Sequence, residues 1–190
     1  MKLITRLEKS TSFWFILISS VVFFLLRLPS LFEPYWYGDE GVYQAVGILI
    51  RDGAPLFSGA WDNKPPLLLL LYALFNSDQF VIRAVSLIFG VMSVIVFYFL
   101  AKRLFEKNNL AIYISAGIFT FFLGSPIIEG NIANTENFMI LPILISAYII
   151  TSTDFIKRAF ENRIYFLSGF ILSLAFLSKI VAIFDFFAFS

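Results

Sequence analysis

Long runs of apolar residues constrain this chain more than any other feature of its sequence. The runs cover residues 11–31, 80–104, 110–128, 135–151 and 164–190. A helix needs about 20 apolar residues to cross the hydrocarbon core of a bilayer. The chain is 59% hydrophobic and contains 25 Phe among its 190 residues, which is more apolar surface than a soluble domain can bury. The sequence therefore predicts an all-α, polytopic transmembrane bundle of about five spans.

The first and last runs carry one basic residue each. Arg27 lies near the end of the run at 11–31, and Lys179 interrupts the run at 164–190. The first run could also be read as a signal peptide, but it has no small-x-small cleavage site and further spans follow it. The sequence stops inside an apolar run, so we expect the N-terminal part of a longer protein with an incomplete transmembrane domain.

Composition excludes several classes of function. The net charge is +1, without the clustered basic face that a nucleic-acid partner requires. The chain has no Cys and no His, which excludes thiol chemistry, disulfides and His-ligated metals. We predict no metal site and no certain cofactor, although carboxylates leave room for a divalent cation.

The long loop at 32–79 contains two short segments with helical patterns. In residues 39–51 apolar side chains recur at helical spacing, and Gly53 stands where a helix stop is expected. Residues 65–76 form a second apolar segment with Pro in its first turn. Both segments are too short to cross a bilayer, so we predict interfacial helices. The apolar positions of the first segment are Val42, Val46, Leu49 and Ile50.

Lys and Arg residues predict the orientation in the membrane. Nine of the fourteen lie at the N-terminus, at 102–107 and at 157–163, which fall on one side if each run crosses once. The positive-inside rule places that side in the cytoplasm. We therefore expect an integral, multi-pass protein, in the plasma membrane if prokaryotic. Its N-terminus would be cytoplasmic, and the loop at 32–79, the turn at 129–136 and Lys179 would face outward.

The first interfacial segment begins with adjacent carboxylates, Asp39 and Glu40. An ionised carboxylate in a partly dry cleft can act as a general base on a hydroxyl. Tyr43 and Gln44 lie four residues further on, on the same helix faces, where they could orient the acid or contact a sugar. The alternative is that Asp39 only caps the helix, which is a common use of Asp.

A second group of polar residues, Asp62-Asn63-Lys64, precedes Pro65-Pro66. A residue before Pro is pushed toward an extended conformation, so Lys64 projects from a stiffened corner. Its ammonium could meet a phosphate, or it could be an interfacial Lys at a helix start. Arg83, Glu136 and Lys179 lie near the ends of spans, where snorkelling and capping compete with a functional role.

These motifs resemble a known family. Gly-Asp-Glu-Gly-x-Tyr, Asp-Gly-x-Pro and Trp-Asp-Asn-Lys-Pro-Pro-Leu follow a short first span, in residues 38–67. The pattern is similar to that of the membrane glycosyltransferases of the protein O-mannosyltransferase and aminoarabinose-transferase type, which have the GT-C fold. The resemblance continues through residues 81–84, 133–136 and 175–179.

The resemblance implies an enzyme that transfers a sugar, with inversion, from a polyprenyl-phosphate donor to a hydroxyl of a protein or lipid. It implies Asp39 as the catalytic base, Lys64 and Lys179 beside the donor phosphate, and Glu136 on the acceptor side. Relatives are longer, and some have Asp at the position of Glu136. We predict Asp39 and Glu40 as catalytic residues. The predicted substrate-binding residues are Tyr43, Asp62, Lys64, Arg83, Glu136 and Lys179.

Two other classes of function remain open at this point. A transporter of a lipid-linked anion would place its charges on broken helices near the middle of the bilayer, whereas here they gather at one interface. A non-catalytic or truncated membrane subunit would also fit a chain that ends in an apolar run.

Overall fold

The computed structural model describes residues 10–34, 37–152 and 161–189. The prediction of an all-α fold is confirmed, since no strand occurs in these residues. Short 3-10 turns, η1 (Leu28–Leu31), η2 (Pro126–Ile128) and η5 (Ile180–Ala182), separate some of the helices. The helices are α2 (Thr11–Arg27), α3 (Gly38–Arg51), α4 (Pro66–Leu74), α5 (Gln79–Leu104), α6 (Asn109–Gly124), α7 (Thr135–Ile150), α8 (Glu161–Ser178) and α9 (Ile183–Phe189).

Polar side chains cap the helix starts. The side chain of Ser10 accepts a hydrogen bond from the backbone N–H of Phe13 at the start of α2. Asp78 caps α5 and Asn108 caps α6 in the same way. Each cap satisfies one of the N–H groups that have no partner within the helix, which explains why these apolar helices begin at these residues.

Two helical segments are long and apolar enough to cross a membrane, Thr11–Leu31 and Gln79–Leu104. The other apolar helices of the described residues are shorter. The predicted third span, 110–128, is not one helix, because α6 ends at Gly124. Ser125 is extended and precedes Pro126, which disfavours the helical conformation for the residue before it.

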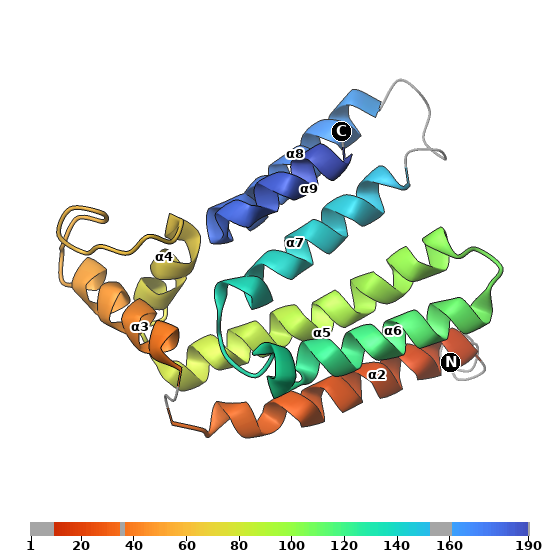
Figure 1. Ribbon diagram of the computed structural model, residues 1–190, viewed down its shortest axis with the longest axis horizontal. Helices are drawn as coiled ribbons and strands as arrows, with labels where there is room; N and C mark the ends of the chain where they lie inside the picture. The colour runs from red at the N-terminus through yellow and green to blue at the C-terminus, as the bar shows by residue number, and fades with distance from the viewer. Residues whose placement is uncertain (1–9, 35–36, 153–160, 190) are drawn as a thin grey trace, which may run out of the picture.

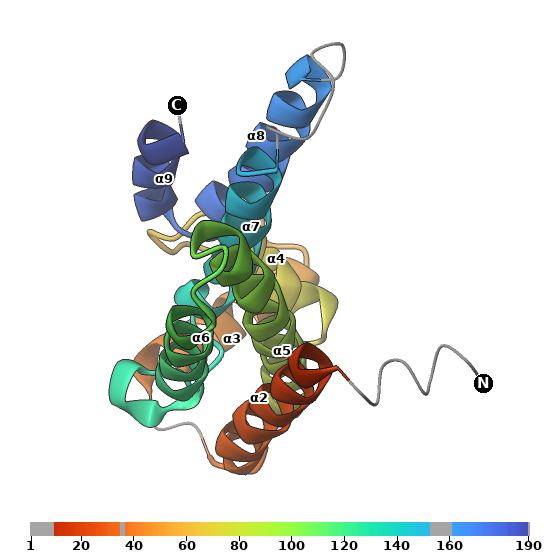
Figure 2. The same ribbon diagram turned by 90° about the vertical axis from the view of Figure 1, so that its right-hand side faces the viewer.

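Figure 1 shows α2, α5 and α6 running alongside one another, with α7 packed on α5 and α8 packed on α7. The same arrangement is seen end-on in Figure 2. Helices α3 and α4 pack together at one end of α5. The turn between α6 and α7 and the end of α8 lie at this end too, while the connection between α5 and α6 lies at the other. We call the end with α3 and α4 the site end.

The residues that set the predicted orientation are only partly described. Lys2, Arg6 and Lys9, and Lys157 and Arg158, lie outside the described residues. The described basic residues at 102–107 are at the end opposite the site end. Which end faces the cytoplasm therefore stays a prediction.

The two helices of the loop enclose a small core of their own. Tyr43 and Val46 of α3 pack with Leu68, Leu69 and Tyr72 of α4, together with residues of α5 and α7. This core fixes α3 against the end of the bundle.

The four apolar positions predicted to form one face of α3 do not share one environment. Val46 is buried, whereas Val42 and Leu49 are each 45% exposed. Burial instead follows Glu40, Tyr43, Val46 and Gly47. The helix is confirmed, and its location at a membrane surface stays a prediction.

Helix α8 is interrupted at Lys179, where the sequence predicts an interruption. Lys179 has an extended backbone, and the chain turns through η5 into α9. Within this turn Ala182 donates its backbone N–H to the carbonyl of Lys179. The side chain of Lys179 is thereby presented at the site end.

Candidate active site

Asp39 lies in the first turn of α3 with a carboxylate that is 44% exposed. Its Oδ2 lies 3.2 Å from the hydroxyl of Tyr43 and 3.9 Å from Nζ of Lys64. The N-cap of α3 is Tyr37, and no side chain caps this helix. Asp39 is therefore not the cap that one interpretation of the sequence predicted, and its carboxylate is open to solvent beside a hydroxyl and an ammonium.

The corner that holds Lys64 is shaped by Asp62. Oδ1 of Asp62 accepts a hydrogen bond of 2.8 Å from the backbone N–H of Lys64. Pro65 follows in an extended conformation and Pro66 begins α4. Asp62 thus stabilises the backbone of this corner, and the side chain of Lys64 extends toward Asp39 of α3.

Tyr43 connects Asp39 to the start of α7. Its hydroxyl lies within hydrogen-bond distance of Oδ2 of Asp39 and, at 3.3 Å, of Oδ1 of Asn134. The side chain is almost completely buried. Burial, and then the nearby charge of Asp39, raise the pKa of Tyr43 above its usual value of 10.0. The hydroxyl therefore remains a donor at any physiological pH.

Glu40 and Arg83 form a buried pair beside this group. Arg83 Nε lies 3.0 Å from Oε1 of Glu40, and Arg83 Nη2 lies 2.5 Å from Oε2. Nη1 of Arg83 donates to the carbonyls of Ser30 and Glu33, each at 2.6 Å. Oε1 of Glu40 also accepts the backbone N–H of Ala133 at 2.8 Å. The pair thus joins α3, α5, the end of η1 and the turn before α7.

The burial of this pair bears on the predicted roles of its members. Both side chains are completely buried, and their charged atoms form hydrogen bonds with other groups of the same chain. The roles of Glu40 in catalysis and of Arg83 in substrate binding stay predictions, and the burial of both favours a structural role.

Glu136 and Lys179, predicted separately, form an ion pair. Nζ of Lys179 contacts Oε1 of Glu136, and the hydroxyl of Thr135 donates to Oε2 at 2.7 Å. Both side chains are partly exposed, 42% for Glu136 and 27% for Lys179. The pair joins the first turn of α7 to the break that follows α8.

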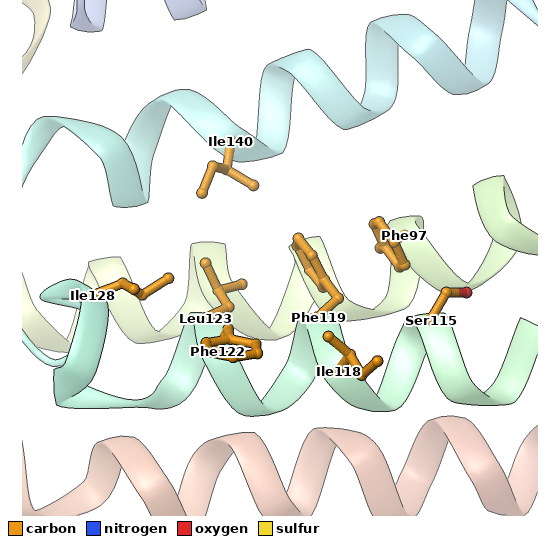
Figure 3. A pocket seen from close by; sticks show the side chains of 8 residues that line it. All are labelled: Phe97, Ser115, Ile118, Phe119, Phe122, Leu123, Ile128 and Ile140. Carbon is orange, nitrogen blue, oxygen red and sulfur yellow. The ribbon is translucent and has the colours of Figure 1, made fainter.

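Two hollows lie next to this group of side chains. A pocket of about 280 Å³ is lined by Leu123, Ile128, Glu129, Gly130, Asn134, Glu136, Asn137 and Ile140. An apolar groove of about 460 Å³ is lined by Phe97, Ser115, Ile118, Phe119, Phe122, Leu123, Ile128 and Ile140 (Figure 3). We call them the polar pocket and the apolar groove. Leu123, Ile128 and Ile140 line both, so the two hollows adjoin.

Metal-ligating side chains are not concentrated in any part of the chain that the structure describes. No group of three or more His, Cys, Asp or Glu residues there is arranged to hold an ion.

The sequence was also compared with known proteins. The dolichyl-phosphate-mannose-protein mannosyltransferase family matches residues 64–189, well over half of the chain. This chain belongs to that family. Members of the mannosyltransferase family are integral membrane glycosyltransferases of the GT-C type. Searches of curated proteins and of solved structures found no match.

The match to the mannosyltransferase family begins at Lys64 and includes Arg83, Glu136 and Lys179. Asp39 and Tyr43 precede it. The structure nevertheless brings Asp39 to within 3.9 Å of Lys64, so the segment before the match and the matched segment contribute to one group of side chains.

Three polar residues beside this group of side chains, Glu129, Asn134 and Asn137, were not among the site residues predicted from the sequence. Asn134 is the N-cap of α7, and its side chain accepts the backbone N–H of Thr135. An Asn immediately before an apolar run signals a helix start, and this signal was present in the sequence. No pattern in the sequence predicted that Asn134 would contact Tyr43, which is 91 residues away.

Proposed function

We propose that this protein transfers a sugar from a polyprenyl-phosphate donor to a hydroxyl group, with inversion, and that Asp39 is the general base. One observation carries the proposal: the half-exposed carboxylate of Asp39 lies between a buried hydroxyl, that of Tyr43, and the ammonium of Lys64. A base beside a cation is what transfer from a phosphate-linked sugar requires. Membership of the mannosyltransferase family supports the reaction class.

In the proposed reaction Asp39 removes the proton from the acceptor hydroxyl. The acceptor oxygen forms a bond to the anomeric carbon while the bond from that carbon to the phosphate oxygen breaks. The electron pair of the broken bond leaves with the polyprenyl phosphate, and attack from the opposite face inverts the anomeric carbon. A phosphate is already a good leaving group, so it needs a cation more than it needs a second acid.

We assign the donor phosphate to Lys64. Its ammonium lies 3.9 Å from Asp39, whereas the ammonium of Lys179 is in close contact with Glu136. Lys64 can therefore exchange Asp39 for a phosphate more easily than Lys179 can exchange Glu136. The low dielectric at the edge of a membrane strengthens such a charge pair. Lys179 would support the same phosphate at longer range, and Glu136 would lie on the acceptor side.

Asp39→Asn tests the role of the base directly. We expect the full chain in lipid vesicles, supplied with a polyprenyl-phosphate-linked hexose, to lose transfer activity by roughly 10²- to 10⁴-fold, the usual contribution of a general base. Asp52→Asn is the matched control, because Asp52 follows the other end of the same helix and its side chain is 65% exposed.

Two outcomes would count against the proposal. Normal turnover by Asp39→Asn would remove Asp39 from the chemistry. Absence of transfer by the unmodified chain, to any lipid or peptide hydroxyl, would contradict the function itself.

A further inference from the structure

The polar pocket is connected to Asp39 through two side chains. Asn134 lines the pocket, and its Oδ1 lies 3.3 Å from the hydroxyl of Tyr43. That hydroxyl lies 3.2 Å from Asp39. A ligand in the pocket would therefore contact Asn134, and the hydroxyl of Tyr43 links Asn134 to Asp39, the residue that we propose as the base.

The charges around the polar pocket disfavour an anion. Its polar lining consists of Glu129, Asn134, Glu136 and Asn137, and no Lys or Arg is among its lining residues in the described chain. Lys179 neutralises Glu136, while Glu129 accepts a hydrogen bond of 3.3 Å from the amide of Asn134. A phosphate entering here would lose its hydration and meet the carboxylate of Glu129 instead of a cation.

The same lining suits hydroxyl groups. Carboxylates accept hydrogen bonds, and the amides of Asn134 and Asn137 both donate and accept them. A head group that carries hydroxyls and no charge can add hydrogen bonds to the oxygens of these side chains without an electrostatic penalty.

The apolar groove leads away from the pocket along α6. Ser115, Phe119 and Leu123 are spaced by four residues and so lie on one face of that helix. Phe97 of α5 stacks on Phe119 with ring centroids 4.1 Å apart (Figure 3). Ile118 on the rim is 54% exposed, so the groove is open at this residue.

A hydrocarbon chain fits this groove better than a peptide does. The groove offers one hydroxyl, that of Ser115, which already donates to the carbonyl of Ile112. The backbone N–H and C=O groups of a peptide would have no partners there, and each unpaired group in an apolar medium costs several kcal/mol.

We propose that the polar pocket and the apolar groove together bind the acceptor, and that the acceptor is a lipid with an uncharged, hydroxyl-bearing head group. This inference rests on the proposed function, since the protein has an acceptor only if it transfers a sugar. It assigns the two hollows to the acceptor and leaves the donor phosphate on the side of Lys64.

Binding of three lipids tests the inference without any need for catalysis. The full chain in detergent micelles is titrated, with native mass spectrometry as the readout, against a hexosyl-diacylglycerol, a phosphatidic acid with the same acyl chains, and a polyprenyl phosphate. We expect the neutral lipid to bind at least tenfold more tightly than the phosphatidic acid.

Ile118→Trp fills the groove and should weaken binding of the neutral lipid on the order of tenfold, the scale of losing two buried methylene groups. Ile114→Trp is the matched control. Ile114 lies one turn away on α6, is 52% exposed against 54% for Ile118, and does not line the groove. The control also reports any effect of a Trp on folding.

Three results of the binding experiment would overturn the inference. Phosphatidic acid could bind as tightly as the neutral lipid. Ile118→Trp could weaken binding of the polyprenyl phosphate instead of the neutral lipid, or both Trp variants could bind the neutral lipid equally well. In transfer assays we expect Ile118→Trp to raise KM for the lipid acceptor and to leave KM for the donor unchanged. Efficient transfer to a hydroxyl peptide that is insensitive to Ile118→Trp would also overturn it.

The two proposals fail separately. Selective, groove-dependent binding of the neutral lipid without any transfer would contradict the proposed function alone. Transfer that depends on Asp39 but not on the groove would contradict only the assignment of the acceptor.

Discussion

Neighbouring carboxylates in α3 have opposite environments. Asp39 is half exposed and Glu40 is completely buried, because adjacent residues of a helix point about 100° apart. The exposed acid is available for chemistry. The buried acid binds Arg83 and the backbone of Ala133, and so holds its neighbour in place.

Glu40→Gln tests this structural role. The amide keeps the size of the side chain but leaves the guanidinium of Arg83 buried without a negative charge. Breaking a buried ion pair typically costs about 3–5 kcal/mol. We expect a loss of stability near the lower end of that range, measured by thermal unfolding in detergent. Asp39→Asn is the comparison, and equal stability of the two variants would contradict the anchoring role.

Tyr43→Phe tests the link between Asp39 and Asn134 through its dependence on pH. A pKa that is raised in the folded protein stabilises the fold below the unfolded value of about 10, and this contribution disappears as the pH rises through the folded value. We expect the unmodified protein to lose stability above about pH 10, and Tyr43→Phe to lose less. Identical pH profiles in thermal unfolding would count against the buried hydrogen bonds of Tyr43.

The spacing of residues predicted local relationships, whereas distant ones followed only from the family resemblance or were missed. The four-residue spacing placed Asp39 and Tyr43 on one helix face, and a hydrogen bond joins them. The pairing of Glu40 with Arg83, 43 residues apart, depends on how α3 packs against α5. Periodicity describes one helix at a time, so no pattern in the chain could distinguish a buried Glu40 from an exposed Asp39.

At the scale of elements, α2 and α5 pack closely together at Gly90. A Cβ atom at Gly90 would lie 2.1 Å from Cζ of Phe23, a ring that is almost fully buried. Because Gly90 has no side chain, it leaves the space on α5 that the ring of Phe23 occupies.

Gly90→Ala should push these two helices apart and destabilise the protein by about 1–3 kcal/mol, the usual cost of overpacking. Gly117→Ala in α6 is the control, because no atom beyond the adjoining residues and backbone of α6 lies within 4 Å of the added methyl group. Thermal unfolding midpoints should fall for the first variant and stay level or rise for the second, since Ala favours a helix over Gly. Equal midpoints would contradict the close packing.

Across the whole molecule, the residues of the candidate site gather at one end. Asp39, Lys64, Glu136 and Lys179 all lie at the site end, and the basic connection between α5 and α6 lies at the other (Figure 1). If the connection at 102–107 is cytoplasmic, as the positive-inside rule predicts, the site faces outward.

Single cysteines test this orientation, because the chain has no Cys of its own. Ser58→Cys, in the exposed loop at the site end, should react with a membrane-impermeant maleimide in intact cells. Lys107→Cys, exposed at the other end, should react only after permeabilisation. The reverse pattern would place the site in the cytoplasm.

The hydrogen bond between Glu40 and Ala133 also has a consequence for biosynthesis. The two residues are 93 positions apart, so the acid leaves the ribosome long before its partner. At about 5–20 residues per second, the delay is roughly 5 to 20 s. Throughout that interval Glu40, next to Asp39, lacks its hydrogen bond to the turn before α7. The site therefore cannot be complete until residue 133 has been synthesised, and a nascent chain that stalls before this residue cannot contain it.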